Sequence, residues 1–233
     1  MATATQILDR ASMVTGLFST GNERTLAFQA LQNAYVRSLM DSEAVVSSTS
    51  ASLTAGTNEY TISTLFGVTP LKIRDMILVN GNDYVQLDRV PEDRLFEDDL
   101  GPQYNGYPQE YAALGTTKIL LYPRPSSGLS LKMYYVPNAP TLIESSATPG
   151  AGEEITPSYI PVQFHWDVLY AGLVTELFDK DQRTKDVQFW NQRYLDGLSR
   201  LRAWSASFAG DANGSWVKRG RNGIRYPDQR SRY

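Results

Sequence analysis

The sequence predicts an α+β protein, in which N- and C-terminal helices form a helical bundle, an antiparallel β domain is inserted between them, and an extended C-terminal arm follows. Three observations predict this order. Apolar residues recur every three to four positions near the beginning, the period changes to two after Asp41, and the helical period returns at Val162. After Ser205 no period remains, and glycines mix with Asn, Asp and Arg, a composition that cannot form a core by itself.

Two helices are expected before the strands. Residues 22–41 place apolar side chains such as Leu31 and Leu39 on one face, the pattern of an amphipathic helix. Residues 5–17 show a shorter pattern of the same kind, and the Ser-Thr-Gly-Asn cluster at 19–22 separates the two.

Alternating and β-branched residues then predict a series of short strands. Their expected ranges are 45–53, 59–63, 71–79, 84–87, 110–114, 118–122 and 129–135. Asn80-Gly81-Asn82 predicts a tight hairpin turn, because Asn-Gly readily supplies positive φ angles. In the last strand Leu131 and Met133 share one face while Lys132 and Tyr134 share the other, which predicts a half-buried antiparallel strand.

Two helices are expected after the strands, joined by a short polar turn at 179–182, although one long bent helix would also fit the pattern. Their apolar stripes are Val162, Trp166, Leu169, Leu173 and Leu177, and then Val187, Trp190, Tyr194, Leu198 and Leu201. The predicted parts of the chain are 1–43 for the N-terminal helices, 44–152 for the β domain, 153–205 for the C-terminal helices and 206–233 for the basic arm.

Composition excludes several kinds of chemistry. The 233 residues contain no Cys, which rules out disulfides, thiolate nucleophiles, Cys-ligated zinc and iron–sulfur clusters, and a single His, which rules out multi-histidine metal sites. That residue, His165, has no nucleophile motif beside it and is interpreted as a packing or interface residue. Glu92, Glu97, Asp98 and Asp99 are interpreted as a solvated acidic loop. No catalytic residue, cofactor or metal is therefore expected.

Charge is distributed unevenly along the chain. There are 22 Lys and Arg against 25 Asp and Glu, yet residues 217–233 hold six basic residues and one acid, a local charge of +5 that leaves −8 for the rest. Residues 82–110 hold eight acids and two arginines. The candidate docking residues of the arm are Trp216, Lys218, Arg219, Arg221, Arg225, Tyr226, Arg230, Arg232 and Tyr233. Basic residues interleaved with aromatics suit nucleic-acid binding, but the acidic body of the chain favours docking of the arm on a protein.

Membrane and export signals are not expected. Residues 1–10 lack a basic stretch followed by an apolar one, which argues against a secretory peptide. No apolar run approaches the roughly 18 residues of a spanning helix.

The strand region carries a recurring pattern of Tyr and Pro. It reads P-x-x-Y from Pro108, then an apolar strand ending in Y-P-x-P at Tyr122, then an alternating strand ending in Y-Y-x-P at Tyr134. With Leu53–Tyr60 upstream, Ile160-Pro161 downstream and the order of helices and strands, the chain resembles the head-to-tail adaptor (connector) proteins of tailed bacteriophages.

That resemblance implies a structural protein of the virion neck, assembled in the host cytoplasm and lacking catalytic residues. Adaptors of this kind form rings, usually of twelve copies, beneath the portal protein. Their C-terminal arm often grips the portal, and a tail, nozzle or tail-completion protein binds the opposite face. Double-stranded DNA passes transiently through the central channel without sequence-specific binding. Residues 82–110 are a candidate for the channel wall.

Trp166, Trp190, Tyr194 and Trp204 are accordingly expected in the bundle core or in contacts between copies. The alternative from another class is a β-domain binding module, such as a minor tail or receptor-recognition protein, whose Tyr-rich loops contact a sugar or a host protein. An enzyme is the third interpretation. Low charge, at 20% of residues, together with 14 tyrosines suits a subunit with large interfaces.

Overall fold

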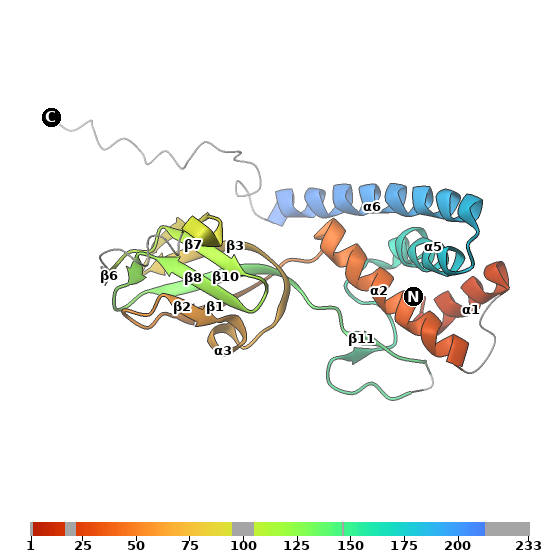
Figure 1. The fold of residues 1–233 in the computed structure, drawn as a ribbon, viewed down its shortest axis with the longest axis horizontal. Helices are drawn as coiled ribbons and strands as arrows, with labels where there is room; N and C mark the ends of the chain where they lie inside the picture. Colours follow the sequence, from red (N-terminus) through yellow and green to blue (C-terminus); the bar gives the residue numbers. More distant parts are fainter. Residues whose placement is uncertain (1, 17–21, 95–104, 146, 213–233) are drawn as a thin grey trace.

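The computed structural model describes residues 2–16, 22–94, 105–145 and 147–212. Figure 1 shows most of the helices at one end of the molecule and most of the strands at the other, with the chain crossing between them near the middle. The predicted α+β fold, with N- and C-terminal helices packed together and an inserted β domain, is confirmed.

The N-terminal helices form as predicted. Helix α1 spans Ala4–Thr15 and begins with a capping box, in which the Thr3 side chain accepts from the Gln6 amide and the Gln6 side chain accepts from the Thr3 amide. Gly16 ends the helix at a φ of 72°, a left-handed conformation that glycine adopts without steric cost. Helix α2 spans Asn22–Ser42 and buries Leu31 and Leu39 completely.

The C-terminal helices differ from the prediction in two details. A 3₁₀ turn (η1, Val162–Phe164) and a π-helical stretch (η2, His165–Tyr170) precede helix α5 (Ala171–Lys180), so the first stripe does not lie on one regular α-helix. Two separate helices do follow, since α6 begins at Thr184. It continues to Ala212, whereas the arm was predicted to begin at 206, because Ala-rich residues there are compatible with a helix.

The β domain contains two four-stranded sheets. One has the order β1-β10-β3-β4 and is antiparallel throughout; the other has the order β2-β8-β7-β5 and is antiparallel except for its β5/β7 pair. Their strands are β1 (Ser47–Ser52), β10 (Ser130–Pro137), β3 (Pro70–Asn80), β4 (Asp83–Gln86), β2 (Glu59–Thr61), β8 (Lys118–Tyr122), β7 (Glu110–Leu114) and β5 (Asp88–Arg89). Two short parallel pairs are β6 (Asn105–Gly106) with β9 (Arg124–Pro125), and β11 (Thr141–Leu142) with β12 (Glu153–Glu154).

The predicted hairpin is confirmed, with a correction to its turn. Asn80 pairs with Asp83, so the two turn residues are Gly81 and Asn82, and among them Gly81 alone has a positive φ, of 58°. The strand predicted at 59–63 is also shorter than expected. After Thr61 the chain forms a short helix, α3 (Ile62–Phe66), which buries its first and last side chains in the β-domain core.

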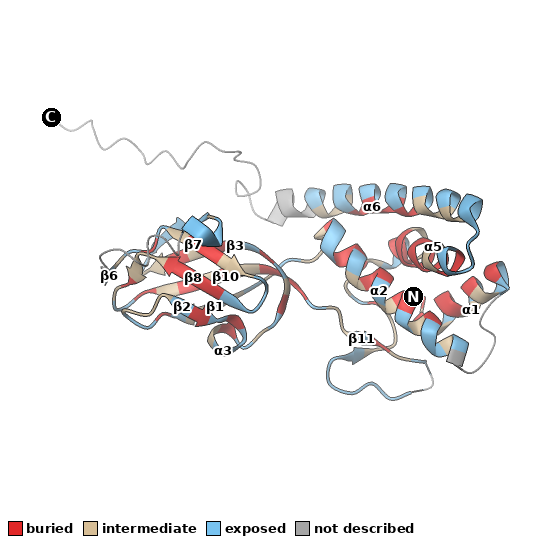
Figure 2. Cartoon of the chain, viewed as in Figure 1, coloured by how far each residue is buried: buried red, intermediate tan, exposed pale blue. Residues whose placement is uncertain are grey.

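Buried hydrophobic residues form two large clusters, one in each part of the molecule (Figure 2). The bundle cluster also includes Val136 at the end of β10, with Leu71 of β3 packed against it. The loop that carries β11 packs on the bundle as well, where the Gln32 side chain donates to Pro140 O and accepts from the Leu142 amide. The long central strands therefore enter the helical core, and the two parts share an apolar contact.

Candidate functional site

A row of aromatic rings lies along the helices at the positions of two predicted tryptophans. Trp166 packs edge-to-face on Tyr170 at a centroid distance of 5.7 Å, and Tyr170 packs on Trp190 at 5.4 Å. Phe189 extends the row at 5.4 Å from Trp190 and is 63% exposed. This aromatic row consists of Trp166, Tyr170, Phe189 and Trp190. Tyr170 and Phe189 were not predicted, although Tyr170 lies one helical turn after Trp166 in the sequence.

Arginine side chains border the aromatic row. The Arg10 guanidinium lies 4.6 Å from the Trp166 ring, and the Arg193 guanidinium lies 5.4 Å from the Trp190 ring. Such cation–π contacts hold an arginine in place beside an aromatic ring. Aromatic and arginine side chains together are characteristic of protein interfaces, so this row is a candidate binding surface.

The other two predicted aromatic residues lie elsewhere. Tyr194 is buried in the bundle core, with its hydroxyl 3.4 Å from Ser38 Oγ. Trp204 is partly buried and packs edge-to-face on Phe164 at 6.0 Å, near the end of α6. The structure thus brings Trp166 and Trp190 together through Tyr170 and separates Tyr194 and Trp204 from them.

Helix α6 is held against the π-helical stretch by a close backbone contact. A Cβ atom on Gly197 would lie 2.5 Å from the Asp167 carbonyl oxygen, so only glycine fits there without a shift of the main chain. On either side of this contact, Arg193 and Arg200 reach the Asp167 carboxylate at 3.5 Å and 2.9 Å. This close contact and the two ion pairs fix α6 relative to the π-helical stretch, which carries Trp166 and Tyr170 of the aromatic row.

His165 was predicted to be either a packing or an interface residue, and in the structure it is a packing residue. Its side chain is fully buried, and Nε2 lies 2.8 Å from Ile160 O and 3.1 Å from Pro157 O. Because both neighbours are acceptors, the proton belongs on Nε2, and the ring ties the start of the π-helical stretch to the preceding loop. Within the described ranges no group of three or more His, Cys, Asp or Glu residues could hold a metal ion.

Tyr35 and Tyr194 are ionisable side chains that are buried in the bundle, and Glu176 is half-buried there. Burial raises the pKa of Tyr35, whose hydroxyl accepts from the Tyr159 amide at 2.9 Å, and burial likewise raises the pKa of Tyr194. Burial also raises the pKa of Glu176. The Tyr35 and Tyr194 hydroxyls help to hold the bundle together, Tyr35 through the Tyr159 amide and Tyr194 through Ser38 Oγ.

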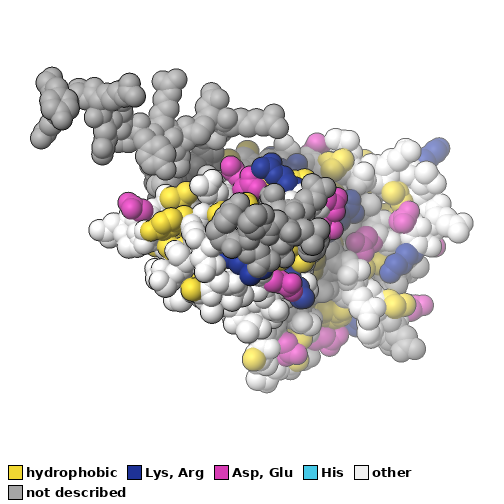
Figure 3. Space-filling model, turned by 60° about the vertical axis from the view of Figure 1, so that its left-hand side comes forward, with side chains coloured by type: hydrophobic (Ala, Val, Ile, Leu, Met, Phe, Trp, Pro, Cys, Tyr) yellow, Lys and Arg dark blue, Asp and Glu magenta, His cyan; other side chains and the backbone are white. Residues whose placement is uncertain are grey.

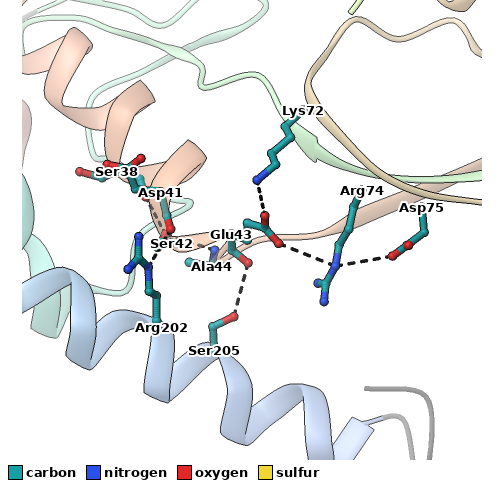
Figure 4. A network of polar contacts seen from close by, with 10 residues as sticks. All are labelled: Ser38, Asp41, Ser42, Glu43, Ala44, Lys72, Arg74, Asp75, Arg202 and Ser205. Carbon is teal, nitrogen blue, oxygen red and sulfur yellow. Dashed lines mark hydrogen bonds and ion pairs between the residues drawn. The ribbon is translucent and has the colours of Figure 1, made fainter. Parts of the chain in front are cut away.

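A polar network joins the bundle to the β domain where α2, β3 and α6 meet (Figure 4). The Glu43 carboxylate binds Lys72 and lies 3.7 Å from Arg74 Nε. On its other side, Ser205 Oγ donates to Glu43 O at 3.4 Å, and Arg202 Nε donates to Asp41 O at 2.8 Å. We call Glu43, Lys72, Arg74 and Ser205 the junction network; composition and periodicity carried no signal for it.

The β-domain surface carries mixed charge. In Figure 3 acidic and basic side chains lie interspersed with hydrophobic ones on the described part of the face in view. Glu110 of the predicted acidic segment pairs with Arg94 at 2.8 Å, and Lys118 pairs with Glu59. The nine candidate residues of the arm lie outside the described residues, as do Glu97, Asp98 and Asp99 of the acidic segment.

Comparison with families of known proteins gives a match that covers most of the chain. Residues 2–218 match a family model described as SU10 adaptor protein. No curated protein matches the chain. Among the helices of the described ranges, none combines the length and apolarity needed to cross a membrane.

Proposed function

The chain belongs to the SU10 adaptor protein family of phage head-tail adaptors, and on that premise we propose that it forms a ring that joins the portal to the tail and lines the DNA channel. The family gives it a structural role in a bacteriophage, and adaptors are not a class of enzyme. The match over residues 2–218 is the observation that carries the proposal. The proposed location is the neck of the virion, with assembly in the host cytoplasm.

Two structural features support the proposal that the chain is a subunit that contacts other protein chains. The aromatic row leaves Phe189 63% exposed beside arginine side chains, and the β domain exposes Tyr84 at 57% and Tyr107 at 56%. Large exposed aromatics on two parts of one chain suit a protein that contacts partners on more than one side. A closed ring needs such distinct surfaces, because each copy contacts its two neighbours through different faces.

Native mass measurement tests the ring. The purified chain should assemble into a closed oligomer, proposed to contain twelve copies, either alone or when mixed with the portal protein of the same phage. Substitution of Phe189 by Ser should weaken that assembly, while the control Ser199→Ala, at another exposed α6 position, should leave it unchanged. A monomer that stays monomeric with the portal would contradict the ring, and glycan binding by that monomer would favour the binding-module alternative.

The basic arm is proposed to dock on the portal. Because α6 continues to Ala212, truncation after that residue removes 213–233 and keeps the whole helix. The truncated chain should keep the melting temperature of the parent and lose portal binding in a pull-down. A second variant, with the six Lys and Arg of the arm replaced by Gln, separates charge from chain length.

Unchanged portal binding by both arm variants would remove the docking role from the arm. A salt titration with double-stranded DNA tests the other interpretation of the arm. A nucleic-acid arm predicts affinity that falls steeply with salt, whereas passage of DNA without specific binding predicts weak affinity at every salt concentration.

A further inference from the structure

Glu43 has a backbone conformation that is unusual for its residue type. It follows the last residue of α2 with a φ of 48°, and its amide donates to Leu39 O at 3.0 Å, closing the helix. Glycine commonly takes this left-handed position after a helix, because any Cβ there costs conformational energy. Among the described non-glycine residues, positive φ angles occur at Glu43 and Gln182.

The side chain of Glu43 reaches the sheet from this turn. Its carboxylate binds Lys72 Nζ and lies 3.7 Å from Arg74 Nε, and both partners belong to β3. The contact is partly shielded, with 31% of the Glu43 side chain exposed. A glycine would make the same turn at lower conformational cost but could not make either ion pair.

Strand β3 is irregular at the residue that Glu43 contacts. Asp75 pairs with Tyr134 and Ile73 pairs with Tyr135, so Arg74 has no partner of its own in the ladder and forms a β-bulge. A bulge changes the direction in which a side chain leaves its strand. In Figure 4 the Arg74 side chain lies between the Glu43 and Asp75 carboxylates, each 3.7 Å from its Nε.

The backbone of the same turn is held from the opposite side. Ser205 Oγ donates to Glu43 O and Arg202 Nε donates to Asp41 O, so α6 contacts the turn through two side chains (Figure 4). One residue therefore contacts β3 with its carboxylate and α6 with its carbonyl.

We propose that Glu43 is a positioning residue that sets the orientation of the β domain on the helical bundle. The carboxylate acts through Lys72 and Arg74, and its ion pairs offset the cost of a left-handed glutamate. Its use in assembly rests on the proposed function, since a ring requires the bundle and the β domain of each copy to meet the neighbouring copies at the same time. The orientation itself can be measured on the isolated chain.

The test measures a distance between the two parts. Because the chain has no cysteine, Ser199→Cys on α6 and Thr64→Cys on α3 give two unique sites for spin labels, both exposed. The parent should give one narrow distance peak by pulsed electron paramagnetic resonance. Glu43→Gln and Glu43→Gly should each lose that narrow peak and give a broad distribution, and high salt should broaden the parent peak toward the same result.

Gln182→Gly is the matched control, because it relieves a left-handed φ of 57° in the turn between α5 and α6 without touching the junction network. It should leave the distance peak narrow. The double variant Lys72→Gln/Arg74→Gln removes the partners instead and should broaden the peak as Glu43→Gln does, with no further change when all three are combined.

Circular dichroism on each variant separates a reoriented domain from an unfolded one. A narrow, unshifted peak in Glu43→Gln and in the Lys72/Arg74 variant, with the fold intact, would overturn the proposal and assign the orientation to the Val136 and Leu71 contacts. A ring that fails to form in the parent, with the distances behaving as expected, would contradict the proposed function and leave the positioning role standing.

Discussion

The helical bundle and the β domain are held together by different kinds of contact. In the β domain, two sheets enclose a core to which β10 contributes every second residue, such as Leu131 and Met133. In the bundle, helices approach through small residues, with Gly197 against the Asp167 backbone and Gly172 against the Ala34 side chain. Both cores depend on side-chain volume, and the bundle depends in addition on the absence of a side chain at two contacts.

This difference explains how substitutions should act in each part. Removing volume from the β domain leaves a cavity, and the cost rises with the size of that cavity. Added volume at a bundle glycine displaces the neighbouring helix, through its backbone at Gly197 and through side chains at Gly172. Loss of carbon atoms is therefore costly in both cores, whereas an added carbon atom is costly at the two glycine contacts of the bundle.

The largest effect is expected from Leu131→Ala in the centre of β10, where the side chain is fully buried. Its free energy of unfolding should fall by about 2–5 kcal/mol. Leu173→Ala in α5 is the matched variant in the bundle, also fully buried. Because Leu71 and Val136 of the sheet pack in the bundle core, we expect a single cooperative transition to move with either substitution. Thermal unfolding followed by circular dichroism checks this.

Two separate transitions, each moved by one of these variants, would show that the shared apolar contact does not couple the parts. Leu195→Ala, at a 47% exposed position of α6, is the control for loss of leucine without loss of a core contact, and should move the transition little.

A smaller but sizeable effect is expected from Gly197→Ala. Glycine within a helix normally costs about 1 kcal/mol relative to alanine, so a free position would gain stability from this change. Here the new Cβ would lie 2.5 Å from Asp167 O and 2.9 Å from Asp167 C, and the free energy of unfolding should instead fall by about 1–3 kcal/mol. Urea unfolding measures the difference.

Gly172→Ala is the matched variant, because its Cβ would meet side-chain atoms of Ala34 and Tyr194 at 3.2 Å rather than backbone. It should cost less than Gly197→Ala. Equal stability of Gly197→Ala and the parent would mean that the close backbone contact is not what fixes α6.

The same difference decides what the sequence could predict. Strands β7 and β8 have the predicted bounds of 110–114 and 118–122, because each is a short apolar run and the turn residues Gly115-Thr116-Thr117 separate them. The half-buried face of β10 could be predicted from the alternation of its residues, and the turn at Gly81 from the Asn-Gly pair, which readily supplies a positive φ. The short helix α3 was missed, since Ile62 continues the alternation that begins at Tyr60, and five residues are too few to distinguish a helix from a strand.

In the bundle, the apolar stripes predicted the helices, but they could not predict which residues of different helices contact one another. A periodic pattern cannot show that Gly197 meets the backbone of Asp167, or that residues 165–170 form a π-helical stretch, because both depend on how two helices meet. The junction network was beyond sequence reasoning for a similar reason. Glu43 looks like an ordinary helix-end glutamate until its partners Lys72 and Arg74, about thirty residues away, are placed beside it.

The smallest effect is expected at Glu176, an acidic side chain that is half-buried in the bundle. Burial raises the pKa of Glu176 above its ordinary value of 4.5, while Lys180 and Arg37 oppose the rise. Because the folded chain then holds this proton more tightly than the unfolded chain, stability falls as the pH rises through 4.5 toward the raised pKa, and stays lowered above it. Glu176→Gln should therefore raise the melting temperature at neutral pH by about 1–2 °C and lose that advantage below pH 4.5.

Melting temperatures of Glu176→Gln and the parent across this range of pH measure the difference, with Glu23→Gln at an exposed position of α2 as the control for loss of a carboxylate. An advantage of Glu176→Gln that does not change with pH would assign the effect to packing of the amide instead of burial of charge. In that case the glycine contacts would distinguish the bundle from the β domain, and the partial burial of the Glu176 carboxylate would not.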